Sequence, residues 1–195
     1  MSSKWRRGGI PGRKRRTQIE GQFVAYTREM IESPAYRVLS LQARKILRRL
    51  EIEHCSHGGA ENGRLPCTYD DFIKYGCWRN GISPALVEAT ALGFIEITSI
   101  GKRGYGDIPG KASSYRLTYL PTHDGAAPTN EWKKIESIEA ANAIVKQAIG
   151  DYEVWLNTNP MSQRKRYQVR TKNRSPVSDN GLIQSPRRDY RKGRA

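Results

Sequence analysis

The chain has 195 residues, enough for one domain with appended segments or for two small domains. Apolar residues make up 37% of it, charged residues 27%, and the mean hydropathy is −0.72, so we expect a modest core. No stretch approaches the roughly 20 consecutive apolar residues of a membrane span, and the basic start lacks the apolar segment of a secretory signal. These features predict a cytoplasmic protein without a membrane partner.

The net charge of +15 lies entirely in the two ends of the chain. Residues 1–16 carry seven Lys or Arg and no acid, and residues 161–195 carry eleven against two Asp, whereas residues 17–160 sum to −1. A polyanionic partner suits this distribution, because each neutralised phosphate releases counterions. The alternative is a pair of solubilising ends.

Cys55, Cys67 and Cys77 are too few, and odd in number, for a disulfide framework, so we expect reduced thiols. With His54 and His57 they could form a zinc site, which needs four converging ligands. The chain has no closely spaced Cys pair, so we favour structural cysteines and predict no metal and no cofactor.

The first segment, residues 1–21, is predicted to be a disordered basic arm, because its cations bracket Gly and Pro. Such an arm can lie in a DNA groove or along phosphates. The residues assigned to this contact are Arg6, Arg7, Arg13, Lys14, Arg15 and Arg16.

Helices are expected next. Thr27 and the Ser33–Pro34 pair each open a short helical turn. Ser40 then caps a long helix that reaches about His54. Four basic residues occupy its outer side, either as phosphate contacts or as an ordinary solvated face: Arg44, Lys45, Arg48 and Arg49.

A short edge strand at residues 64–67 leads into a pair of helices. Thr68 can cap the first, with Asp71 placed to complete a capping box, and Gly76 ends it. The second helix has apolar residues at spacings of three and four over residues 82–92.

A β-hairpin follows the helical pair. Ile95 and Ile97 alternate with polar residues in the segment 94–100, and residues 114–119 alternate in the same way. The loop between them, residues 101–111, is basic and rich in glycine.

This order of helix, turn, helix and hairpin resembles a winged helix-turn-helix domain, and Leu92–Ile97 matches its leucine-glycine-hydrophobic step from helix into wing. The chain is also similar to winged-helix proteins of bacterial plasmids, phages and mobile elements, and more distantly to the N-terminal domain of plasmid replication initiators. The resemblance covers about residues 23–135 and implies an α+β fold of three helices and a wing. Its narrower motifs are Tyr26–Met30, Leu39–Leu41 with Ala43, Asn62–Pro66 and Tyr69–Phe72.

The resemblance implies that the N-terminal part of the second helix enters the major groove and reads bases through Trp78, Arg79, Asn80 and Ser83. Arg can grip guanine through two donors, and Asn can pair with adenine. Pro84 leaves two alternatives: Ser83 caps a helix that begins at Pro84, or Pro84 falls within the first turn of a helix that begins near Arg79. Trp78 and Arg79 could instead be turn residues packed on the body.

The hairpin loop is expected to meet flanking phosphates or the minor groove through Lys102, Arg103 and Lys111, while Tyr105 stacks or fills the loop. Its glycines lie between two strands, whereas a nucleotide-binding loop requires a strand before it and a helix after it. We therefore infer no nucleotide.

The predicted domain, residues 22–120, is followed by a linker at 121–130 and a C-terminal helical segment at 131–158. Within that segment a helix is expected at 131–149, whose apolar stripe either packs back on the domain or pairs with a second copy in a homodimer. Residues 159–195 are expected to form a disordered basic tail.

The leading prediction is a sequence-specific protein for double-stranded DNA that regulates transcription on a bacterial mobile element and is associated with the nucleoid. One alternative is a plasmid or phage replication initiator, and another is non-specific binding of RNA or nucleoid DNA through the basic arms. We do not expect an enzyme. Asp70 and Asp71 lie where a helix N-terminus favours negative charge, and His54 and Cys55 would point about 100° apart on a helix.

Overall fold

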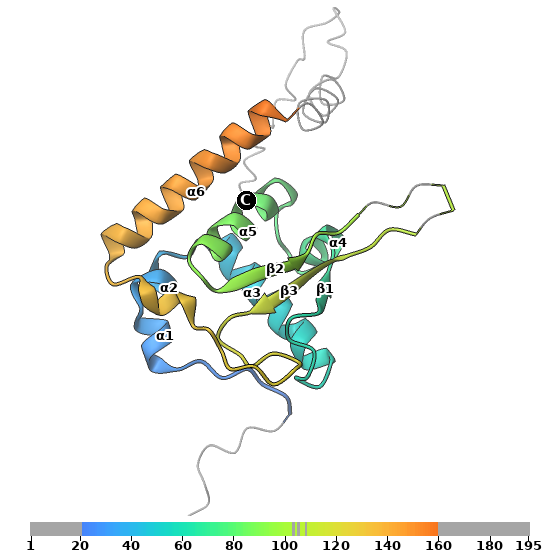
Figure 1. The fold of residues 1–195 in the computed structure, drawn as a ribbon, viewed down its shortest axis with the longest axis horizontal. Coiled ribbons are helices and arrows are strands. Elements are labelled where there is room, and N and C mark those ends of the chain that lie inside the picture. The colour runs from blue at the N-terminus through green and yellow to red at the C-terminus, as the bar shows by residue number, and fades with distance from the viewer. Residues whose placement is uncertain (1–20, 103, 105, 108, 160–195) are drawn as a thin grey trace, which may run out of the picture. The chain divides into compact units, whose positions relative to one another are not determined.

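The computed structural model describes residues 21–102, 104, 106–107 and 109–159, so the predicted basic arm and most of the predicted tail lie outside the described residues. The described part is an α+β protein with one three-stranded antiparallel sheet (Figure 1). The chain divides into two compact units after Tyr152, and the second contributes only residues 153–159 to the described part. No helix there is both long and apolar enough to cross a bilayer.

The first three helices begin where the sequence predicts. Helices α1 (Arg28–Glu32) and α2 (Pro34–Val38) follow Thr27 and Ser33. The hydroxyl oxygen of each capping residue accepts a hydrogen bond from the backbone N–H three residues later. Helix α3 (Leu41–Ser56) is capped in the same way by Ser40 and ends two residues later than predicted. Its inner side lies at the centre of the hydrophobic core, with Ala43, Ile46, Leu47 and Leu50 fully buried.

The helical pair is also confirmed. Helix α4 (Tyr69–Lys74) has the predicted capping box between Thr68 and Asp71, and Gly76 beyond it has a φ of +94°, which glycine adopts most easily. A 3₁₀ turn, η1 (Arg79–Gly81), then leads into helix α5 (Ile82–Ala91). Pro84 therefore lies in the first turn of α5, where a missing N–H costs no helical hydrogen bond. This agrees with the second alternative for Pro84, except that the helix begins at Ile82 and not near Arg79.

The sheet has the strand order β1 (Leu65–Cys67), β3 (Ser113–Leu117), β2 (Ile95–Ser99), so β1 is an edge strand as predicted. Strand β3 ends at Leu117, two residues earlier than expected. Ile97 is 41% exposed, so the predicted burial of alternate residues fails there. The register of β2 against β3 shifts between Ile97 and Ser99, so the regular alternation ends at this point. Figure 1 shows the chain continuing from the two strands away from the helices.

The predicted helix at 131–149 is wrong at its start. Glu131–Lys134 form a 3₁₀ turn, η2, the chain then becomes extended, and helix α6 runs from Ile138 to Thr158. Burial explains the difference, because the Trp132 ring stacks on Phe94 at a centroid distance of 6.5 Å. Tertiary packing thus fixes the backbone before the helix can begin.

The end of α5 is packed against η2 through Gly93. A Cβ atom at this position would lie 2.7 Å from Glu131 Cβ and 2.8 Å from the Trp132 nitrogen, so no side chain fits. Trp132, Ile135 and Ala141 belong to the same hydrophobic core as α3 and the sheet. The residues before and after the predicted linker therefore share one core.

A buried amide joins the loop after α3 to the base of the hairpin. Asn62 is fully buried and donates hydrogen bonds to the carbonyl oxygens of Leu117, Leu120 and Pro121. Its own carbonyl oxygen accepts from the Leu117 N–H at 2.8 Å. One buried side chain thus satisfies backbone groups of three residues at and after the end of β3.

Candidate nucleic-acid interface

The turn between α4 and α5 is held in place by α3. The Lys45 amine donates to the Gly76 carbonyl oxygen at 2.8 Å, and the Gln42 side-chain oxygen accepts from the Trp78 N–H at 3.2 Å. Cys77, between these two contacts, is buried. The backbone that leads into η1 is therefore fixed by two side chains of α3.

Three of the four predicted base-reading residues are exposed together on this turn, which we call the tip (residues 78–80). The Trp78 side chain is 64% exposed, and Arg79 and Asn80 also face solvent. The nearest acid to Arg79 is Asp70, whose carboxylate lies 3.9 Å from the guanidinium. Both of these side chains are more than 70% exposed, so water screens the pair and its energy is small.

Ser83, the fourth, lies in a different environment. It is half-buried, and its hydroxyl is 2.6 Å from the hydroxyl of Tyr69. This contact links the first turn of α4 to the first turn of α5. The structure therefore gives Ser83 a role in joining the two helices that the sequence did not indicate.

The predicted wing places two of its cations side by side. Lys102 and Lys111 are paired across the hairpin, with backbone hydrogen bonds of 2.9 and 2.8 Å in the two directions. Neither amine has a hydrogen-bond or ion-pair partner among the described residues, and like charges opposite each other destabilise a hairpin. Arg103 and Tyr105, which were assigned to the same loop, lie outside the described residues.

The two sides of the hairpin approach each other closely at Gly101, between the strands and the lysine pair. A Cβ atom on Gly101 would lie 2.7 Å from both the Lys111 oxygen and the Ser113 nitrogen. The Gly101 N–H donates to the Ser113 hydroxyl at 2.9 Å. This contact continues the pairing of β2 and β3 to the two lysines.

The basic outer side of α3 is not a free cationic face. Arg44 lies over the Tyr36 ring, Lys45 binds the Gly76 carbonyl, and Arg48 lies over the Tyr26 ring. Arg49 forms an ion pair of 2.7 Å with Glu53 in which both side chains are largely buried. All four side chains therefore stabilise contacts within the protein.

Sequence reasoning missed two buried carboxylates. The first is Glu88, a buried residue of α5. Its carboxylate accepts from the Ser40 N–H at 2.5 Å and the Ser40 hydroxyl at 2.7 Å, at the N-terminus of α3. Negative charge at a helix N-terminus is favourable. No short-range pattern could have found this contact, because the two residues are 48 positions apart.

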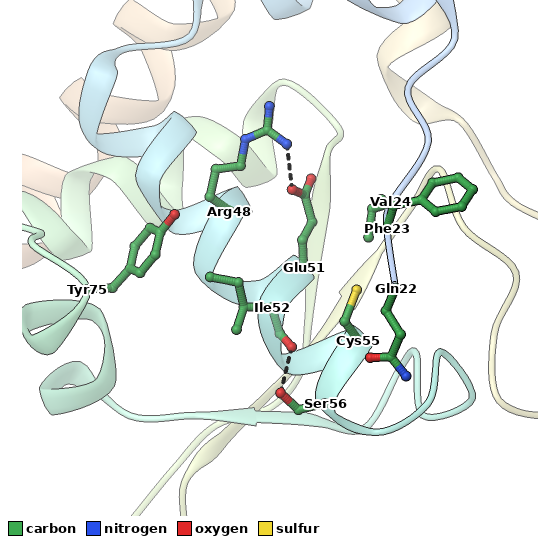
Figure 2. A pocket seen from close by; sticks show the side chains of 9 residues that line it. All are labelled: Gln22, Phe23, Val24, Arg48, Glu51, Ile52, Cys55, Ser56 and Tyr75. Carbon is green, nitrogen blue, oxygen red and sulfur yellow. Dashed lines mark hydrogen bonds and ion pairs between the residues drawn. The ribbon is translucent and has the colours of Figure 1, made fainter. Parts of the chain in front are cut away.

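Glu51 is the second. It is buried on α3 and accepts hydrogen bonds from the hydroxyls of Tyr26 and Tyr119, with Arg48 at 3.1 Å on its other oxygen. Burial, followed by the charge of Glu51, raises the pKa of both tyrosines above the ordinary value. Figure 2 shows Arg48 and Glu51 beside an open groove of about 370 Å³ between α3 and the extended segment 22–24.

The cysteines are unpaired, in agreement with the sequence prediction. Burial raises the pKa of Cys67 to about 12, and it also raises the pKa of Cys77, so both thiols stay protonated at neutral pH. Among the described residues no group of His, Cys, Asp and Glu is arranged to hold a metal ion. Asp71, one of the two aspartates considered for catalysis, is used in the capping box.

Neither a family model, nor a curated protein, nor a solved structure matches this chain.

Proposed function

We propose that the chain is a winged-helix protein that binds double-stranded DNA sequence-specifically and regulates transcription on a bacterial mobile element. The observation that carries the proposal is the tip, where Arg79 and Asn80 face solvent directly before α5. The side chains that pair with guanine and adenine edges are of these two types.

The surrounding layout supports the proposal. Three helices, α3, α4 and α5, precede the hairpin of β2 and β3, an order compatible with a winged helix. Gln42 and Lys45 of α3 bind the backbone at and before the tip, so the proposed base-reading residues are held in a fixed position. A fixed position reduces the ordering cost of binding.

The lysine pair of the hairpin supports a phosphate partner. A phosphate between Lys102 and Lys111 would turn a repulsive pair into two charge-assisted hydrogen bonds. In this proposal the hairpin grips the backbone and the tip supplies the discrimination. The predicted basic arm would add sequence-independent affinity.

Selection of bound duplexes from a random pool tests the proposal. A consensus sequence is the expected result, and a palindromic consensus would indicate that two copies bind together, which is the homodimer alternative for the helix expected at 131–149. A pool that stays random after selection would favour non-specific binding through the arms.

The double substitution Arg79→Ala with Asn80→Ala should then weaken binding at the selected site by about 2 to 6 kcal/mol, from about 1 to 3 for each lost base contact. The matched control is Arg37→Ala with Asn142→Ala, exposed residues of the same types on α2 and α6. An equal loss on every sequence would show that the tip does not read bases. A footprint at the protein's own promoter, and not at a replication origin, would separate a regulator from an initiator.

A further inference from the structure

Trp78 differs from the other tip residues in chemistry. An indole offers one N–H donor and no acceptor, so it is poorly suited to reading the edges of base pairs. It offers instead a flat aromatic face, and 64% of this side chain is exposed. A tryptophan exposed to this extent offers the face of its ring to a partner.

The indole is held in one place. Its backbone N–H is bound by Gln42, and the ring rests against Gly81, where an added Cβ atom would lie 3.3 Å from Trp78 Cε3 and 3.4 Å from Gln42 Cγ. Gly81 has ordinary right-handed angles, φ −88° and ψ −9°, so the backbone does not require glycine there. Because Gly81 has no side chain, there is space for the indole of Trp78.

The surroundings of the ring indicate the class of partner. Lys45 binds the carbonyl oxygen of Gly76, two residues before Trp78, and Arg79 follows Trp78 directly, with its guanidinium 3.9 Å from the exposed Asp70. An aromatic face with cations on neighbouring residues suits a nucleotide, which carries a ring and a phosphate together. Asn80 adds an exposed amide that can bond to the edge of a base.

We propose that Trp78 is a stacking platform for an unpaired nucleobase, so that the protein binds DNA with an extrahelical base more tightly than fully paired DNA. Every base has an aromatic face, so this contact does not depend on sequence. The inference rests on the proposed function only in sharing DNA as the partner, and it requires no consensus site.

The test uses two 24-base-pair duplexes of one sequence. In the first, a single 2-aminopurine is an extra, unpaired base, and in the second it is paired with thymine. The wild-type chain should bind the first about tenfold more tightly, because aromatic stacking is commonly worth that much per base. The fluorescence of the unpaired 2-aminopurine should fall on binding, as it does when the base stacks.

Trp78→Ala should remove both the affinity difference and the quenching, while Trp78→Phe should keep part of each. Gly81→Val should reduce both although Trp78 is present, because the new side chain displaces the indole. Trp155→Ala, at an exposed tryptophan of α6, is the matched control and should change neither. Thermal unfolding of each variant checks that the fold is kept.

The outcomes separate this inference from the proposed function. Sequence-selective binding with equal affinity for the two probes would overturn the stacking site and leave the proposed function intact. A tenfold preference that Trp78→Ala abolishes would support the site even if selection from a random pool returned no consensus. A preference that survives Trp78→Ala would overturn it.

Discussion

The polar side chains of the body have hydrogen-bond partners within the protein, whereas those of the tip and hairpin mostly face solvent. Asn62, Glu51 and Glu88 are buried and bonded to other parts of the protein, and the four cations of α3 also have internal partners. Asn80, Lys102 and Lys111 face solvent without such partners among the described residues. If charge were the only criterion, the four cations of α3 would favour this helix as the binding face. Their partners within the protein argue against it.

Two asparagines give the strongest test of this difference. Asn62→Ala should lower the free energy of unfolding by about 3 kcal/mol, because it leaves the Leu117 N–H and three carbonyl oxygens without their buried partner. Asn80→Ala, at an exposed position, should change it by less than about 0.5 kcal/mol. Urea denaturation measures both. Similar effects of the two substitutions would remove the distinction between body and tip.

The ion pair of α3 gives the next largest effect. Arg49→Ala should lower the free energy of unfolding by about 2 kcal/mol, because Glu53, whose side chain is only 16% exposed, loses its closest ion-pair partner and keeps only His57, at 3.1 Å. The salt dependence of DNA binding should stay the same, since Arg49 is already neutralised within the protein. A smaller salt slope in this variant would mean that α3 does contact phosphate.

Acidification tests the buried side of α3. Burial lowers the pKa of His54 below the ordinary 6.5, although the charge of Glu51 opposes the change. Between the two pKa values the unfolded chain binds the extra proton, so the free energy of unfolding must fall as the pH decreases below about 6.5. One proton limits this slope to about 1.4 kcal/mol per pH unit.

His54→Leu should flatten the decline in stability between pH 7 and pH 5 that His54 causes. Urea denaturation at pH 7, 6 and 5 provides the comparison with the unsubstituted chain. An unchanged decline in the variant would show that His54 does not carry the effect.

The lysine pair should have the smallest effect on stability, and in the opposite direction. Lys102→Ala with Lys111→Ala should raise the free energy of unfolding by a few tenths of a kcal/mol, because it removes like charges from facing positions. The slope of log affinity against log salt should become shallower by about 2, the change expected for two lost phosphate contacts. Lys134→Ala with Lys146→Ala, elsewhere on the surface, is the control and should leave the slope unchanged.

Local patterns predicted most of the helices. A capping residue and a glycine act within a few positions, so Ser40, Thr68 and Gly76 marked helix ends correctly. Arg79 and Asn80 were expected in the N-terminal part of the second helix. They are exposed but lie in the 3₁₀ turn η1 before α5, and their contact with DNA stays a prediction.

Errors arose where distant segments decide the local structure. Because Trp132 stacks on Phe94, α6 begins later in the chain than the helical pattern around Glu131 predicts. The contact of Glu88 with Ser40 could not be inferred for the same reason. Periodicity reports which side of an element is apolar, and it carries no information on which remote residue will lie against it.

The packing of Trp132 against Phe94 and Gly93 also limits where the chain can be truncated. A chain that stops within residues 121–130 would uncover the ring of Phe94 and leave the space beside Gly93 empty, because the segment after residue 130 fills both. Among the described residues Ala141 is the last that is fully buried in the core, so a fragment that keeps this core has to reach past it. A truncation designed from the proline- and glycine-rich stretch would cut through the hydrophobic core.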